Sequence, residues 1–154
     1  MTLQTHTELN SAQKKKLMQL WNTEYPAGLN YLTLDHFDGY LDKLEDVAHF
    51  LLTDKEGLIK GWYFDFRRDG EKWFGLIINS SLHGQGFGKA LLDRAKSIEK
   101  ELSGWVIDSE AKLRKEGQPY RSPLEFYQKN GFEVLENVRL ELPRISAVKV
   151  RWRL

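Results

Sequence analysis

Three glycines and a lysine stand close together between a run of apolar residues and a segment of helical periodicity. The glycines are Gly84, Gly86 and Gly88, and Lys89 follows them directly. Glycine lets the backbone approach a ligand closely, and the first N–H groups of a helix have no partners within the helix. A strand, a glycine-rich turn and a helix N-terminus together form a cradle for an anion. The sequence therefore predicts a phosphate-binding turn here.

Two common phosphate-binding loops do not fit this spacing. A Walker A loop would need a glycine at the position of His83 and a serine or threonine at the position of Ala90. A dinucleotide-binding G-x-G-x-x-G that starts at Gly84 would need a glycine where Lys89 stands, and the strand-first βαβ context is missing. The turn therefore belongs to another kind of site.

The strand before the turn and the helix after it follow from the apolar pattern. Residues 73–79 are apolar on both faces, which is typical of a central buried strand. Apolar residues recur at helical spacing from Gly86 through Leu102, and Gly104 ends this predicted helix. Residues 105–108 follow as a short buried strand, which we expect to lie parallel to the strand at 73–79.

The chain before this unit predicts strands and two helices. Asp69-Gly70 is a strong hairpin signal. Ser11 and Asp35 are the expected N-caps of two amphipathic helices. The predicted strands cover residues 3–9, 47–53 and 58–66. Together the strands next to the hairpin form an antiparallel meander.

The chain after residue 108 begins with a polar, basic connection over residues 109–121. Ser122-Pro123-Leu124-Glu125 predicts a helix start, with Ser122 as N-cap and Glu125 closing a capping box, and Asn130-Gly131 ends that helix. Two long strands, each with its apolar residues on one parity, close the chain at 132–142 and 148–154. The order β-α-α-β-β-β-α-β-α-β-β predicts an α+β fold in one domain, residues 1–154.

The composition excludes several classes of protein. The 154 residues carry a net charge of +1, so a basic nucleic-acid binder is disfavoured. Cysteine is absent, which excludes disulfides, thiolate metal sites and a cysteine nucleophile. No apolar run approaches the roughly 18 residues of a membrane span, and the N-terminus lacks a signal core. We expect a cytoplasmic protein with no membrane or nucleic-acid partner.

The glycine turn resembles the acyl-CoA-binding motif of the GNAT acetyltransferase superfamily. That motif reads Arg/Gln-x-x-Gly-x-Gly/Ala between a central strand and a helix, and here it falls on His83 through Gly88. His83 stands where the family usually has Arg or Gln, which weakens a side-chain contact to pyrophosphate but leaves the backbone cradle intact. A second family signature, aromatic-Tyr-x-x-x-Gly-Phe, matches residues 126–132. With the element order, the resemblance covers nearly the whole chain.

The resemblance implies a mixed, mainly antiparallel sheet of six to seven strands, flanked by about four helices, whose central strands splay apart. It also implies acetyl-CoA as co-substrate, no metal, and a pantetheine arm that enters the gap between those strands. Leu76 and Ile78 would offer backbone groups to pantetheine. The residues implied to hold the pyrophosphate are Leu82, His83, Gly84, Gln85, Gly86, Phe87, Gly88 and Lys89.

The resemblance further places Tyr127 beside the thioester sulfur, where it would protonate the leaving thiolate or donate a hydrogen bond to it. A thiol has a pKa of about 8.5 and tyrosine one of about 10, so this transfer is feasible. The attacking amine has a pKa of about 10 and must first lose a proton to a base or in a desolvating pocket. Many family members use a carboxylate on the fourth strand. Others deprotonate the amine through water. Glu71 lies at the hairpin, Lys72 stands roughly where the carboxylate would be expected, and Asp65 and Glu24 are the alternatives.

Two charged segments bear on the substrates. Residues 24–56 contain eight acidic residues against two lysines, and an acidic pocket lining would attract a small cationic amine. Residues 112–121 are basic and would reach a CoA phosphate or cover the site. Trp21 and Tyr25 are candidates for the acceptor pocket. His6, His36 and His49 have no metal-ligand spacing.

Three functions remain open from the sequence. The first is an N-acetyltransferase acting on a primary amine, most simply a small cationic molecule, by direct attack in a ternary complex. The second is a module that binds acyl-CoA without turnover, and the third is an acetyltransferase for a protein or peptide amine. The last strand, which alternates apolar and basic residues, could also pair with a second subunit in a homodimer.

Overall fold

The computed structural model describes residues 1–109 and 112–154, so residues 110–111 of the predicted connection lie outside the described residues. The element order is the predicted one. The α-helices are α1 (Ser11–Glu24), α2 (Leu34–Asp42), α3 (Phe87–Lys96) and α4 (Leu124–Lys129). The strands are β1 (Thr2–His6), β2 (Glu45–Thr53), β3 (Ile59–Arg68), β4 (Glu71–Ile78), β5 (Glu101–Ile107), β6 (Glu133–Leu142) and β7 (Ile145–Arg153). Two short 3₁₀ helices, Ala27–Leu29 and Ser80–Leu82, connect them.

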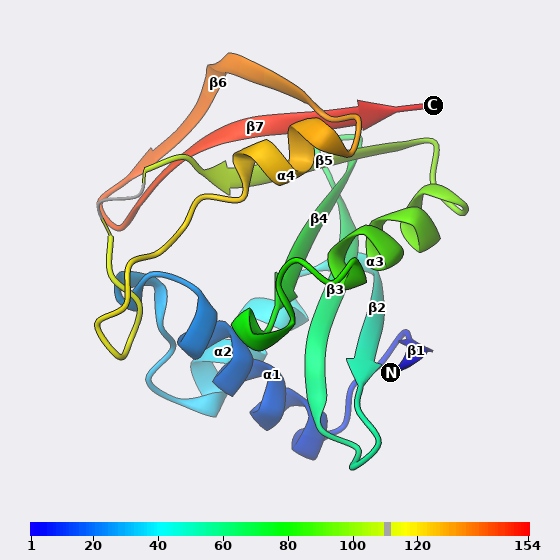
Figure 1. Ribbon diagram of the computed structural model, residues 1–154, viewed down its shortest axis with the longest axis vertical. Coiled ribbons are helices and arrows are strands. Elements are labelled where there is room, and N and C mark those ends of the chain that lie inside the picture. The colour runs from blue at the N-terminus through cyan, green and yellow to red at the C-terminus, as the bar shows by residue number, and fades with distance from the viewer. Residues whose placement is uncertain (110–111) are drawn as a thin grey trace.

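The seven strands form one sheet in the order β1-β2-β3-β4-β5-β7-β6. Every neighbouring pair is antiparallel except β4 and β5, which are parallel as expected. In that parallel pair Trp73 is registered with Ser103, and the strands diverge beyond this point (Figure 1). The sheet therefore opens like a V at its centre, which confirms the predicted splay.

The two faces of the sheet carry separate cores. On one face, α1 and α2 pack against side chains such as Trp62, Phe64 and Ile77. On the other, α3 and α4 pack against Tyr63 and Phe74. Figure 1 shows α3 and α4 on opposite sides of the opening between β4 and β5, with the segment after β5 descending toward α1. In the described part of the chain, no helix is long and apolar enough to cross a membrane.

The hairpin at Asp69-Gly70 forms as predicted, with both residues at positive φ. The two predicted helix caps are wrong by one or two residues. Asn10, rather than Ser11, caps α1 through a capping box with Gln13. Thr33, rather than Asp35, caps α2 by accepting a hydrogen bond from the backbone N–H at the third helical position. In each case another cap-forming residue lies just upstream and takes the position.

The helix predicted from Gly86 through Leu102 is too long. Helix α3 ends at Lys96, and Leu102 is a buried residue of β5, which pairs with β7 from Glu101 onward. Strand pairing therefore overrides the helical spacing. Gly104 does not end a helix; it lies where a Cβ would come within 2.8 Å of the Phe74 ring, so its lack of a side chain admits that ring.

The start of α4 and the pattern of β6 also differ from expectation. Helix α4 begins at Leu124 with Pro123 at the N-cap position, and no capping box forms. In β6 a bulge between Leu135 and Arg139 shifts the register. The shift moves alternate residues to the other face, so Val134 packs in the core under α3 whereas Leu140 packs on the opposite side. The single parity predicted for 132–142 is therefore wrong.

Candidate active site

The glycine turn (residues 83–88) joins β4 to α3 in the predicted strand–turn–helix arrangement. Gly84 and Gly86 have φ values of 79° and 86°, which favour glycine. Gly86 occupies the N-cap position of α3, and no side chain caps the helix there. A Cβ on either glycine would meet nothing within 4 Å. The first N–H groups of α3 therefore begin at an open surface, as an anion cradle requires.

A cleft of about 460 Å³ lies between the glycine turn and α4. We call it the α3–α4 cleft. Nine of the ten residues predicted to bind the cofactor line it, as does Tyr127. Gln85 does not, because its side chain turns back and donates a hydrogen bond to the carbonyl of Ser81. The volume is within the range of about 300–1,000 Å³ that is usual for small-molecule sites.

Two polar residues of the turn have partners within the protein. The Nε2 atom of His83 lies 2.8 Å from the carbonyl oxygen of Ile78. Because a carbonyl only accepts, Nε2 is the donor, and the ring braces the turn against the end of β4. The ammonium of Lys89 forms an exposed ion pair with Asp93 at 2.6 Å. The backbone of the turn is therefore its most available anion-binding group.

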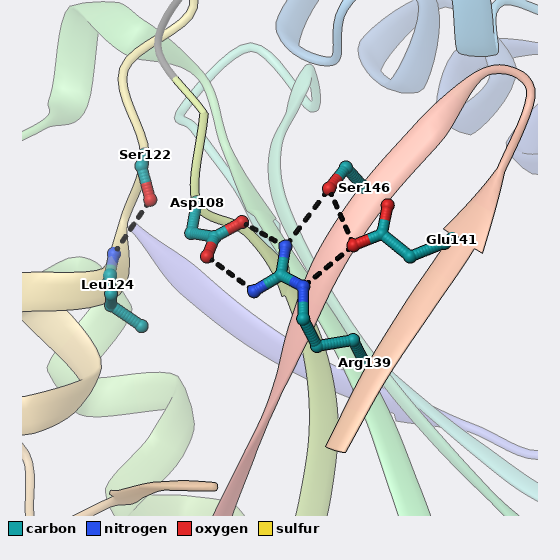
Figure 2. A network of polar contacts seen from close by, with 6 residues as sticks. All are labelled: Asp108, Ser122, Leu124, Arg139, Glu141 and Ser146. Atoms are coloured by element: carbon teal, nitrogen blue, oxygen red, sulfur yellow. Dashed lines mark hydrogen bonds and ion pairs between the residues drawn. The ribbon is translucent and has the colours of Figure 1, made fainter. Parts of the chain in front are cut away.

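The predicted basic connection forms one wall of the site. Arg121, Ser122 and Pro123 line the α3–α4 cleft opposite the glycine turn. The Ser122 hydroxyl accepts a hydrogen bond from the Leu124 N–H at 3.3 Å, as Figure 2 shows. Lys112 and Lys115 do not line any of the three described cavities.

Arg114 anchors this wall to α1. Its guanidinium contacts the carboxylate of Glu24 at 3.2 Å, and Glu24 also accepts a hydrogen bond from the N–H of Ser80. A backbone bridge between Pro26 and Arg114 runs beside this ion pair. All of Glu24, Ser80 and Arg114 line a side cavity of about 430 Å³ next to the α3–α4 cleft. The connection after β5 is thus fastened to the end of α1.

Tyr127 lies where the two arms of the V separate. Its ring is buried and packs edge-on against Phe74 and Phe132. Burial, assisted by Tyr25 and Tyr120, raises the pKa of Tyr127 well above 10. The phenol is therefore protonated at neutral pH and can act as a hydrogen-bond donor. Tyr127, which the helix signature singled out, lies on the wall of the cleft.

Glu71 and Asp65, two of the candidates for the base, lie away from these cavities, as does Lys72 at the position expected for the carboxylate. Lys72 is a buried lysine whose ammonium contacts the carboxylates of Asp46, Asp65 and Glu99 at 3.4–3.5 Å. Burial opposes its charge, but these carboxylates outweigh burial and raise its pKa. Glu71 is held by Lys149 at 2.7 Å. Lys72 and Glu71 are therefore engaged in ion pairs between strands of the sheet.

Glu24 is the one candidate that reaches a cavity wall, in the side cavity. There it is engaged by Arg114 and the Ser80 N–H, as described above. No carboxylate lines the α3–α4 cleft in the part of the chain that the structure describes.

A third cavity, of about 370 Å³, opens on the side of the sheet covered by α1 and α2. We call it the aromatic cavity, because tryptophan, tyrosine and phenylalanine dominate its wall. It shares Leu76, Pro123 and Tyr127 with the α3–α4 cleft. The aromatic residues on its wall are Trp21, Tyr25, Tyr31, Tyr40, Phe64, Phe66, Trp73, Phe74, Trp105, Tyr120 and Tyr127.

The expected acidic pocket is not found. Of the eight acidic residues in 24–56, Glu24 alone lines any of the three cavities, and it lies in the side cavity. Among the described residues on the wall of the aromatic cavity, the charged one is Arg68. Trp21 and Tyr25, the candidates for the acceptor pocket, line this cavity, and Trp73 and Trp105 line it too.

The sequence interpretation missed Arg68 and the β6–β7 hairpin. Arg68 shares the parity of Phe64 and Phe66 on β3, a signal that places all three on one face. The hairpin residues Leu140, Leu142 and Ile145 close one side of the aromatic cavity. They follow the bulge in β6, which the alternation of apolar residues in the sequence does not indicate.

A polar network fixes that hairpin (Figure 2). The guanidinium of Arg139 forms two hydrogen bonds with the carboxylate of Asp108, at 2.8 and 3.0 Å, just beyond the end of β5. It also donates to Glu141 and to the hydroxyl of Ser146. These contacts hold the β6–β7 hairpin against the end of β5.

The sequence and fold of this chain match known acetyltransferases. Residues 45–134 match the family model of the acetyltransferase (GNAT) domain, so the chain belongs to the GNAT family of acetyl-transferring enzymes. No curated protein matches the chain significantly.

Solved structures share the fold at low sequence identity. An aminoglycoside 6'-N-acetyltransferase complexed with coenzyme A is 13% identical, with a TM-score of 0.71 over 99% of this chain and 97% of the other. Escherichia coli ElaA is 16% identical, with a TM-score of 0.70 over 99% and 100%. A variant of the spermidine N-acetyltransferase SpeG from Vibrio cholerae is 16% identical, with a TM-score of 0.67 over 99% and 95%.

Proposed function

We propose that this enzyme transfers the acetyl group of acetyl-CoA to the primary amine of a small molecule, by direct attack in a ternary complex. One observation carries the proposal: the α3–α4 cleft and the aromatic cavity approach from opposite faces of the sheet and share Leu76 and Tyr127. Two substrates could therefore meet at the opening of the V without a covalent enzyme intermediate. The GNAT family assignment supports the choice of reaction.

The α3–α4 cleft suits acetyl-CoA. The N–H groups at the start of α3 and the exposed Arg121 would hold the pyrophosphate, and the free edge of β4 beyond Trp73 would pair with the pantetheine arm. The cofactor supplies an activated acetyl thioester. Tyr127 would donate a hydrogen bond to the departing sulfur, because its raised pKa makes complete transfer of the proton to a thiolate unfavourable.

The aromatic cavity suits the acceptor amine. Its described lining contains no carboxylate, so we assign deprotonation of the amine to desolvation, which lowers the pKa of a buried ammonium. The walls formed by α1, the segment around Tyr120 and the β6–β7 hairpin enclose the cavity on several sides. Such enclosure favours a small molecule over an extended peptide. The sequence argument for a cationic acceptor rested on an acidic lining and loses that support.

A calorimetric titration with acetyl-CoA tests the cofactor. We expect micromolar binding, weakened about tenfold by Arg121→Gln because a charge-assisted hydrogen bond is lost, and unchanged by Lys115→Gln, which lies outside the cleft. Absence of binding up to millimolar acetyl-CoA would overturn the proposal. Binding without thiol release across a broad amine screen would instead favour a non-catalytic acyl-CoA-binding module. Release with peptides alone would favour a protein substrate.

A further inference from the structure

The wall of the aromatic cavity combines many aromatic rings with one charged group. Arg68 is exposed at the end of β3, and its guanidinium lies over the Phe66 ring at 4.9 Å from the centroid. Both residues line the cavity. The neighbouring Arg67 has the opposite parity and pairs with Asp46. Of the two arginines at the end of β3, Arg68 is therefore the one whose side chain lies on the face of the aromatic cavity.

No carboxylate of the described chain neutralises Arg68. The acid registered opposite it on β4 is Glu71, which lies on the same face. Glu71, however, accepts two hydrogen bonds from Lys149, at 2.7 and 3.0 Å, and a third contact from Ser103. Arg68 forms no ion pair within residues 1–109 and 112–154. A guanidinium in this position has donors available for a ligand.

Arg68 and the reacting centre lie at different ends of the cavity. Phe66, under the guanidinium, is registered with Trp73, and Leu76 at the shared wall lies three residues further along β4. Three residues of a strand span about 10 Å. Tyr40, Phe64 and Trp73 line the space between these ends.

From this arrangement we infer the class of acceptor: a primary amine on a flat, apolar body that carries an anionic group, such as a carboxylate, at its far end. The amine would enter the space beside Leu76 and Tyr127, the ring would pack among the aromatic side chains, and the carboxylate would pair with Arg68. This inference rests on the proposed function, because the amine end is defined by where the acetyl group would arrive.

Three para-substituted benzylamines test the inference. They share one ring and carry a propanoate, a propyl or an aminopropyl chain opposite the aminomethyl group. We expect kcat/KM to fall about tenfold from the propanoate to the propyl compound, because the propyl chain offers Arg68 no charged partner. It should fall further for the aminopropyl compound, because Arg68 repels the second ammonium group. In Arg68→Gln the preference for the propanoate compound over the propyl compound should disappear, through a higher KM for the propanoate compound. Arg67→Gln is the matched control and should retain the preference.

Binding of the same compounds is measurable without turnover. Three of the five tryptophans, Trp21, Trp73 and Trp105, line the cavity, so occupancy should change the intrinsic fluorescence. Preference for the aminopropyl compound, equal losses for all three compounds in Arg68→Gln, or no fluorescence change with any of them would each overturn the inference. If acetyl-CoA binds and other amines are acetylated in those cases, the proposed function stands. If acetyl-CoA does not bind, the proposed function fails by itself.

Discussion

The ring of Tyr127 stands edge-on against Phe74, with 5.7 Å between centroids, at the place where β4 parts from β5. Phe74 in turn fills the space left by Gly104 on β5. The position of the Tyr127 ring therefore depends on Phe74 of β4, and the position of Phe74 depends on the absence of a side chain at Gly104 of β5. Tyr127 lines both the α3–α4 cleft and the aromatic cavity.

Tyr127→Phe should separate chemistry from binding. The ring and its packing remain, and only the proton donor is lost. We expect kcat to fall by about a hundredfold, within the usual range for removal of a general acid, while the acetyl-CoA dissociation constant stays the same. Steady-state kinetics and calorimetry measure the two quantities. An unchanged kcat would remove Tyr127 from the mechanism.

Gly88→Ala should narrow the α3–α4 cleft. A Cβ at this position would lie 3.0 Å from the ring of Phe126, so this ring, which also lines the cleft, must shift by a few tenths of an ångström. We expect acetyl-CoA binding to weaken about tenfold, while the better helix propensity of alanine contributes about 1 kcal/mol to stability. Gly39→Ala, also helical but with open space around its Cβ, is the matched control. Equal affinities for both variants would show that the spacing is not limiting.

Lys72→Met should destabilise the fold without affecting the cofactor. Its loss leaves the buried carboxylate of Asp65 without its cation, and removal of one partner of a buried ion pair costs about 3–5 kcal/mol. Arg67→Gln removes an exposed ion pair of the same cluster and should cost no more than about 1 kcal/mol. Urea unfolding measures both. A weaker affinity for acetyl-CoA in folded Lys72→Met would contradict its placement outside the site.

His49 should make stability fall in mild acid. Its Nδ1 accepts a hydrogen bond from the Trp62 indole, and burial, with smaller effects from His6 and Lys14, lowers its pKa from 6.5 to about 4. Below pH 6.5 the unfolded chain binds a proton that the folded chain refuses, so stability declines until about pH 4. The full shift corresponds to about 3 kcal/mol.

Thermal or urea unfolding between pH 7 and pH 4 measures this decline. His49→Gln keeps an acceptor for Trp62 but does not titrate, so its stability should vary less over the same range. His36→Gln, which changes an exposed residue, should follow the unmodified protein. Identical slopes for all three proteins would show that His49 does not govern the response.

The sequence predicts the element order and the glycine turn because both depend on local patterns. Gly84 and Gly86 adopt positive φ values that favour glycine, and nine of the ten residues predicted to bind the cofactor line one cleft. It overextends α3 because Leu102 fits helical spacing as well as a strand, and only pairing with β7 decides. The sequence cannot predict the ion pair between Lys149 and Glu71, because these residues are 78 positions apart and are brought together only by the pairing of the strands.

The aromatic cavity is the least predictable part for the same reason. Its walls come from α1, β3, β4, β5 and the β6–β7 hairpin, so no continuous segment describes it. The acidic content of residues 24–56 is a property of the sequence, whereas the faces on which those side chains lie depend on packing. Arg68 is the exception, since its parity with Phe64 and Phe66 is visible in the sequence.

The single registered pair between β4 and β5 also bears on solubility. Beyond Trp73 and Ser103 both strands present backbone donors and acceptors that no ladder occupies, so the sheet has two open edges in its middle as well as those at its rim. Open edges are templates for strands of other molecules. A pantetheine arm bound between these strands would cover both edges. Aggregation on heating, measured by light scattering, should therefore be greater without acetyl-CoA than with saturating acetyl-CoA. The protein would then be at greatest risk of aggregation whenever its cofactor is scarce.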